Sequence, residues 1–144
     1  MSSAAVTLEK MTTEIPPFLY LLDEDLYRLG NAASPKLHNI RPGHDVNTYE
    51  RNGVVMVRAD GFGISLVTEQ RLQRMNTRGS YLWKLPANFP LPHELALNPD
   101  QTSIRKPGDA PDHYFLCPRF GMTLGEYVAL LSKLALQLER VKKL

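Results

Sequence analysis

The segment Gly61-Phe62-Gly63-Ile64-Ser65-Leu66 carries two glycines and one serine at a spacing that allows a tight turn. Glycine adopts backbone conformations closed to other residues, and it has no side chain to keep a ligand away from the main chain. Such a turn would present one hydroxyl beside exposed backbone amides. We interpret the rest of the chain as built around it.

Ser65 admits two compatible interpretations. Leu66, Leu72 and Met75 are apolar with polar residues between them, a pattern that looks helical and predicts Ser65 as the helix N-cap. The functional interpretation is that the same helix start offers its amides and its positive dipole end to a phosphate. Residues 54–58, which lead into the turn, predict a strand buried on most of its surface.

The remaining pattern consists of short strands, loops and one clear helix. Residues 18–22 are a short apolar run, and the patterns that follow predict further strands at residues 26–29, 81–85, 94–97 and 113–118. Residues 34–52 are irregular and predict a long loop that could cover a site. Thr123 and Glu126 form a capping box that starts a helix, whose apolar stripe runs through Leu138 to Val141. Basic residues Arg140, Lys142 and Lys143 suit the negative end of that helix.

This arrangement predicts the α+β class, because the strands and helices do not alternate as they do in a doubly wound sheet. The 144 residues fit one domain, which we place at residues 16–144 after a loose N-terminus at residues 1–15. Hydrophobic residues make up 43% and charged residues 22%, which excludes a disordered or fibrous chain.

The charge balance gives no sign of a nucleic-acid partner, since 17 basic residues oppose 15 acidic ones for a net charge of +2. The chain shows no signal peptide and no apolar run near the roughly 18 residues of a membrane helix. We therefore expect a cytoplasmic protein without a membrane partner. If it acts in another cell, a route other than a classical signal peptide must deliver it.

Neither the single cysteine nor the four histidines predicts a metal site. Cys117 lies between apolar neighbours, which favours a buried inert thiol over a nucleophile. It also excludes an intramolecular disulfide. His38, His44, His93 and His113 show no close ligand pair, so no zinc is expected.

Three short motifs carry a resemblance to a known family. Leu26-Tyr27-Arg28 stands on an early strand, Ile64-Ser65 follows the glycine turn, and His113-Tyr114 opens a late strand before the terminal helix. In order and spacing they resemble the Tse2 family of toxins, which is similar in fold to ADP-ribosyltransferase toxins and includes type VI secretion effectors and fungal relatives. The resemblance implies a split two-sheet core with a C-terminal helix that binds NAD, as a substrate, in a cleft.

The resemblance also implies site residues. Ile64 and Ser65 match the family's glycine-flanked Thr-Ser pair, with Ile64 in place of the threonine, and His113 matches its histidine. The implied catalytic residues are thus Ser65 and His113, and the implied NAD-binding residues are Arg28, Gly63, Ile64 and Ser65. On its own, Arg28 within a strand fits either a solvated face or a guanidinium that grips phosphate.

The chain departs from the pattern at the catalytic carboxylate. Transferases of this fold usually carry a glutamate on a late strand, where this chain has His113 and Tyr114. Asp112, Glu126 and Glu139 are not convincing substitutes. A histidine could serve instead as a general base, or it could simply hold the cofactor's phosphate or ribose.

Two main hypotheses of function follow. The first is a cytotoxic NAD-dependent ADP-ribosyltransferase that acts in the target-cell cytoplasm and is neutralised by an immunity protein in the producing cell. The alternative is a non-catalytic binding toxin or regulatory module that keeps the fold without turning over NAD. An RNA-modifying enzyme is a third possibility, which the thin basic footprint disfavours.

Overall fold

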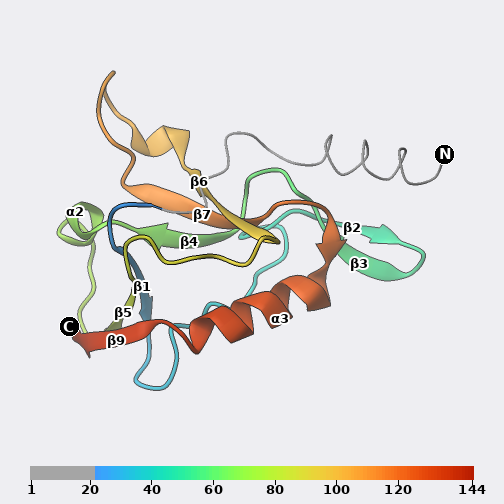
Figure 1. Ribbon diagram of the computed structural model, residues 1–144, viewed down its shortest axis with the longest axis horizontal. Coiled ribbons are helices and arrows are strands. Elements are labelled where there is room, and N and C mark those ends of the chain that lie inside the picture. Colours follow the sequence, from blue (N-terminus) through green and yellow to red (C-terminus); the bar gives the residue numbers. More distant parts are fainter. Residues whose placement is uncertain (1–21) are drawn as a thin grey trace.

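Short strands dominate the computed structural model, which describes residues 22–144 (Figure 1). The expectations for residues 1–15 and for the apolar run before Leu22 lie outside the described residues. The elements, in chain order, are β1 (Leu26–Gly30), β2 (Thr48–Arg51), β3 (Val54–Val57), β4 (Ile64–Val67), α2 (Glu69–Leu72), β5 (Tyr81–Leu85), β6 (Leu95–Pro99), η1 (Gln101–Ser103), β7 (His113–Pro118), β8 (Met122–Thr123), α3 (Leu124–Ala135) and β9 (Glu139–Lys143).

These strands form two sheets whose neighbours pair antiparallel. The larger sheet has the order β6-β7-β4-β1-β5-β9, and the smaller one has the order β2-β3-β8. In Figure 1, α3 runs from β8 of the small sheet to β9 at one edge of the large sheet. The architecture agrees with the predicted α+β class.

The core lies between α3 and the large sheet. Strand side chains alternate between the two faces of a sheet, and most of the fully buried residues of the central strands come from one of them. Leu26, Leu66 and Leu116 are each at most 1% exposed, and Tyr127 and Leu131 of α3 are fully buried in the same cluster. The apolar stripe of the helix therefore covers the apolar face of the sheet, as its spacing predicts.

The C-terminal end of the predicted helix was wrong. α3 begins as expected, with the Glu126 amide donating to Thr123 Oγ1 at 3.0 Å, but it ends at Ala135. Glu139–Lys143 forms the exposed edge strand β9, in which Arg140 lies opposite Trp83. Pairing with β5 satisfies backbone groups of β5 that would otherwise form an open sheet edge. These tertiary hydrogen bonds outweigh the helical preference that the apolar spacing of these residues indicates.

Two smaller expectations also need correction, whereas the strands predicted at residues 26–29, 81–85 and 113–118 are confirmed. β3 is mostly exposed rather than buried, with Val54 46% and Val55 39% exposed, because it belongs to the small sheet. The expected loop at residues 34–52 contains β2, which pairs with β3. Apolar composition alone does not reveal which strand lies under the helix.

Gly63 occupies a position without room for a side chain. A Cβ built there would lie 2.1 Å from the Leu116 carbonyl oxygen, so we expect Gly63→Ala to destabilise the fold by about 1–3 kcal/mol. Gly125 on α3 is the matched control, because its Cβ would meet only Thr123 Oγ1 at 3.9 Å. We expect Gly125→Ala to stabilise by about 0.4–1 kcal/mol. Urea unfolding measures both, and equal effects would contradict the close approach.

Candidate functional site

Ser65 lies in the middle of β4 and does not cap a helix. The helix after it, α2, has only four residues, and its N-cap is Thr68, whose Oγ1 accepts from the Arg71 amide at 3.3 Å. The interpretation of Ser65 as an N-cap, and of its amides as a helix-end phosphate site, was therefore wrong. Pairing with β7 extends the backbone through Val67, and the helical turn starts only beyond it.

The glycine turn before β4 is held from two sides. Gly61 adopts φ +87°, a conformation that favours glycine. The Phe62 amide donates to Asp60 Oδ1 at 3.2 Å, and Asn98 Nδ2 donates to the Gly61 carbonyl at 2.9 Å. The turn is thereby bound to β6, which fixes the position of Ser65 along the sheet.

Beyond this turn the large sheet splits between its two central strands. β1 pairs with β4 at a single position, Tyr27 opposite Val67, whereas β1 pairs with β5 over five positions and β4 with β7 over four. Where the ladder stops, Arg28 Nη1 donates to the Ser65 carbonyl at 3.1 Å. The Arg28 side chain thus bridges β1 and β4 where these strands form no backbone hydrogen bonds.

Arg28 is a poorly solvated cation at this opening. Its Nε is buried and has no hydrogen-bond partner among the described residues. Burial lowers the pKa of Arg28, and the nearby carboxylate of Asp45 opposes that shift. Asp45 itself is bound by Arg41, through the backbone amide at 2.8 Å and through Nη2 at 3.1 Å. The guanidinium therefore has unused donor capacity for an anionic group.

Ser65 and His113 project from the same face of the sheet. In the pairing of β4 with β7, Ser65 lies opposite Phe115 and Val67 lies opposite His113. Opposite residues share a face and neighbours along a strand alternate, so Ser65, Phe115 and His113 lie together. Leu66 and its partner residues face the core.

Arg28 stems from the other face. Because Tyr27 lies opposite Val67, it is Tyr27 that shares the face of Ser65, and Arg28 emerges on the α3 side. The structure brings the Arg28 guanidinium to the backbone of Ser65 rather than to its hydroxyl. Ile64 is fully buried and its amide donates to Tyr127 Oη at 3.1 Å, so neither its side chain nor its amide is available to a ligand.

His113 is held by a carboxylate that sequence analysis missed. His113 Nδ1 lies 2.9 Å from Asp100 Oδ2, and the two side chains are 14% and 19% exposed. The Asp100 amide donates to the His113 carbonyl at 2.9 Å. The ring of Phe115 meets the imidazole edge-on, with centroids 5.0 Å apart.

Asp100 is also fixed at its other oxygen. The amide and hydroxyl of Thr102 donate to Asp100 Oδ1 at 3.0 and 2.7 Å. Burial raises the pKa of Asp100, but the hydrogen bonds from Thr102 and His113 outweigh it and hold the pKa below its ordinary value. The only sequence signal for this residue was an N-cap pattern, an aspartate followed by Thr102 and Ser103.

The carboxylates that sequence analysis weighed have other partners. Asp112 is buried and binds the guanidinium groups of Arg71 and Arg74, which ties α2 to the start of β7. Glu126 stands in the first turn of α3, and Glu139 forms an ion pair with Lys84 at 3.3 Å. None of the three is bound to His113.

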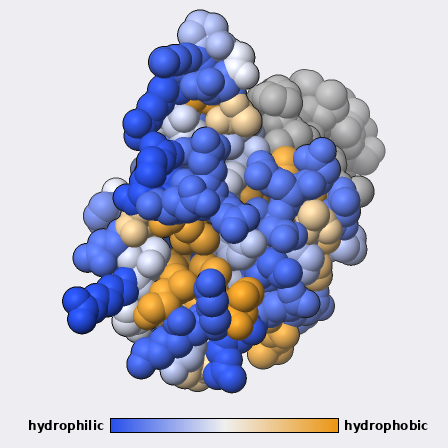
Figure 2. All heavy atoms as spheres, turned by 90° about the vertical axis from the view of Figure 1, so that its left-hand side faces the viewer, coloured by the Kyte–Doolittle hydropathy of each residue, from blue (hydrophilic) through white to orange (hydrophobic). Residues whose placement is uncertain are grey.

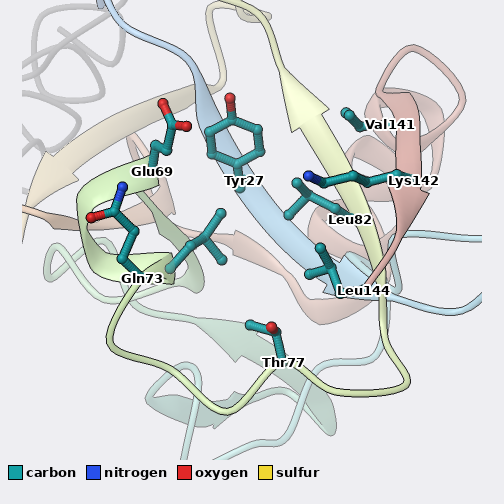
Figure 3. Close-up of a pocket in the computed structure, with 9 residues that line it drawn as sticks. Tyr27, Glu69, Gln73, Thr77, Leu82, Val141, Lys142 and Leu144 are labelled. Carbon is teal, nitrogen blue, oxygen red and sulfur yellow. The ribbon is translucent and has the colours of Figure 1, made fainter.

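A hollow of about 300 Å³ opens on the Tyr27 face of the sheet (Figure 3). Tyr27 is partly exposed and lines it. Figure 2 shows this side of the molecule, where apolar residues gather among hydrophilic ones. Ser65 and His113 are not among the lining residues, which are Tyr27, Glu69, Leu72, Gln73, Thr77, Leu82, Val141, Lys142 and Leu144.

Residues 22–144 contain no cluster of three or more histidines, cysteines or carboxylates placed to bind a metal. They also contain no helix long and apolar enough to span a membrane.

The structure is thus a two-sheet α+β fold whose large sheet opens between its central strands, beside a partly buried arginine. A family model for the Tse2 ADP-ribosyltransferase toxin matches residues 24–143, and the chain belongs to this family. The match confirms the resemblance noted in the sequence and makes the chain a member of a toxin family. Comparisons with curated proteins and with solved structures give no match.

Cys117 is expected to be chemically inert in the native state. It is fully buried, its Sγ lies 3.5 Å from the Ala96 carbonyl, and burial raises its pKa to about 12. Because the thiolate is the reactive form, the native protein should not react with a disulfide reagent at pH 8 and should react after unfolding in urea. Rapid labelling of the folded protein would contradict this environment.

Proposed function

We propose that this protein is an NAD-dependent ADP-ribosyltransferase toxin with the split-sheet ADP-ribosyltransferase fold. The observation that carries the proposal is the opening between β1 and β4, with the partly unpaired Arg28 guanidinium beside it, in a chain of the Tse2 family. The proposed place of action is the cytoplasm of a target cell, reached as a type VI secretion effector or by a similar route. An immunity protein in the producing cell is the proposed partner.

The residues at the opening fit a dinucleotide with a pyrophosphate. Arg28 has a buried Nε without a partner among the described residues, and guanidinium groups bind phosphate oxygens bidentately. Gly63 is buried against the Leu116 backbone where β4 begins, and the Ser65 hydroxyl follows on the His113 face. We assign the pyrophosphate to Arg28 and the nicotinamide ribose to Gly63 and Ser65.

In the proposed reaction, the bond between ribose C1′ and the nicotinamide nitrogen breaks, and nicotinamide leaves with the electron pair. A nucleophile of the acceptor macromolecule bonds to C1′, and its proton passes to His113 as general base. His113 suits this role because the imidazole is 14% exposed and held in one orientation by Asp100. As the bond to nicotinamide breaks, positive charge develops on the ribose, which this assignment places on the Ser65 face of the sheet.

A second candidate function is a toxin that binds its target without catalysis. The positions of β7 on the Ser65 face are occupied by His113, Phe115 and Cys117, so β7 supplies no carboxylate to contact the ribose. This candidate retains the fold and predicts toxicity without NAD turnover.

Incubation with adenylate-labelled NAD in target-cell lysate separates these candidates. We expect macromolecule-bound label and free nicotinamide, with His113→Ala lowering the rate by about 10²-fold or more and Ser65→Ala by about tenfold. Growth arrest should weaken in parallel. His93→Ala and Ser132→Ala are the controls, because His93 is 80% exposed and the Ser132 hydroxyl donates to Val128 on α3.

Each outcome assigns a function. Nicotinamide release without bound label would make the protein an NAD glycohydrolase. Toxic protein that yields neither product would support the binding toxin and reject the enzyme. Folded Ser65→Ala and His113→Ala variants with full activity would remove these two residues from the mechanism.

Arg28→Lys tests the proposed pyrophosphate contact. Lysine keeps the charge and loses the planar fork, so NAD binding should weaken about tenfold or more, as expected for one lost charged hydrogen bond. Arg58→Lys is the matched control, because Arg58 stacks on Tyr49 beside the small sheet. Calorimetric titration with NAD measures both variants, and equal affinities would contradict the assignment of Arg28.

A further inference from the structure

We propose that Asp100 is the positioning carboxylate of this site and that it acts through His113 rather than on the substrate. The inference rests on the proposed function, since it assigns a part of the same reaction. Asp100 would hold His113 as the tautomer with hydrogen on Nδ1, so that the Nε2 lone pair is free to accept a proton. The geometry around the two side chains carries this assignment.

The first step is the tautomer. The Asp100 carboxylate is ionised near neutral pH, and an ionised carboxylate only accepts hydrogen bonds. With Asp100 Oδ2 at 2.9 Å from Nδ1, the hydrogen of the neutral ring must be on Nδ1. Nε2 is then the acceptor of the ring, as a general base requires.

The second step is rigidity. Both carboxylate oxygens of Asp100 are engaged, Oδ1 by Thr102 and Oδ2 by His113. The backbones of Asp100 and His113 are joined as well, so the imidazole and its carboxylate hold a common position. The edge-on contact with Phe115 restricts rotation of the ring. The pair is therefore set before any ligand binds.

The third step is the relation to Ser65. Ser65 lies opposite Phe115, so His113 is its diagonal neighbour across the strand pair, and such neighbours are about 7–8 Å apart. No hydrogen bond between the Ser65 and His113 side chains is present among the described contacts. His113 is therefore placed to accept a proton from an acceptor group bound between the Ser65 and His113 side chains. It does not activate Ser65 as a nucleophile.

A late-strand glutamate would act on the reacting groups with its own carboxylate. In this arrangement His113 accepts the proton, and the carboxylate of Asp100 acts only on His113. As the acceptor X–H bonds to ribose C1′ and nicotinamide leaves with the electron pair of the broken bond, the proton of X–H moves to Nε2. Asp100 remains ionised and stabilises the imidazolium that forms, without taking the proton itself. The carboxylate contributes at a distance, through the ring.

The alternative role of Asp100 is a structural cap. Asp100 is the N-cap of η1, and a residue that only capped this turn would affect stability without affecting the ring nitrogens of His113. The test therefore needs a spectroscopic signature that capping does not change. The nitrogen chemical shifts of the His113 ring provide it, because they distinguish the two neutral tautomers and do not require NAD.

We would compare full-length wild-type protein with Asp100→Asn and Asp100→Ser, using ¹⁵N-labelled histidine at pH 9 and His113→Gln to assign the signals. Both replacements can still cap η1 but carry no carboxylate. We expect the wild type to hold hydrogen on Nδ1 and both variants to gain the Nε2–H tautomer. Label transfer should fall about tenfold or more, since a positioning carboxylate on a histidine base is worth up to about 10⁴-fold.

Thr102→Val and Asp109→Asn are the controls. Thr102→Val removes the hydroxyl bond to Asp100 Oδ1 and leaves Oδ2 on His113, so it should cost stability and keep the tautomer. Asp109 is exposed and should change neither.

An unchanged tautomer in both folded Asp100 variants would overturn the inference, and so would undiminished transfer. If wild-type protein does not turn over NAD, the proposed function fails, and the tautomer comparison still decides whether Asp100 sets the His113 ring.

Discussion

The Tyr127 hydroxyl joins helix α3 to the two strands that carry Ser65 and His113. It accepts a hydrogen bond from the Ile64 amide at 3.1 Å and donates one to the Leu116 carbonyl at 2.6 Å. Ile64 and Leu116 are paired residues of β4 and β7, so the hydroxyl from α3 lies within their ladder. Burial raises the pKa of Tyr127, which keeps the hydroxyl protonated as a donor. One group thus fixes a helix and two strands together, one residue before Ser65.

The same contact decides where the sheet can open. β4 is held to β7 by backbone pairing and to α3 by Tyr127, whereas β1 is held to β5. The two halves meet at the single pair of Tyr27 and Val67 and at the Arg28 side chain. A seam with few hydrogen bonds between two well-paired halves is a region of low local stability within the sheet. A ligand that supplies its own contacts can enter there with the least loss of structure.

Local sequence predicted the elements whose boundaries are set locally. Proline and glycine bound the strands at residues 81–85 and 26–29, and their alternation survives in the structure. β9 escaped prediction because its residues continue the helical spacing of α3, and only the distant β5 favours an extended chain there. Ser65 was mistaken for a cap because the true cap, Thr68, lies three residues further on, where β4 ends.

The residues of the candidate site also fall into those that local sequence indicates and one that depends on distant pairing. Motif order predicted Arg28, Ser65 and His113 as site residues. Asp100 lies thirteen residues before His113, and two carboxylates, Asp109 and Asp112, lie nearer to it in the sequence. What selects Asp100 is the register of β6 on β7. Pro99 lies opposite Tyr114, so the next step of the ladder sets Asp100 against His113. A slip of one residue would turn the carboxylate to the other face. The carboxylate–histidine pair is therefore a property of strand register, which the sequence around either residue does not contain.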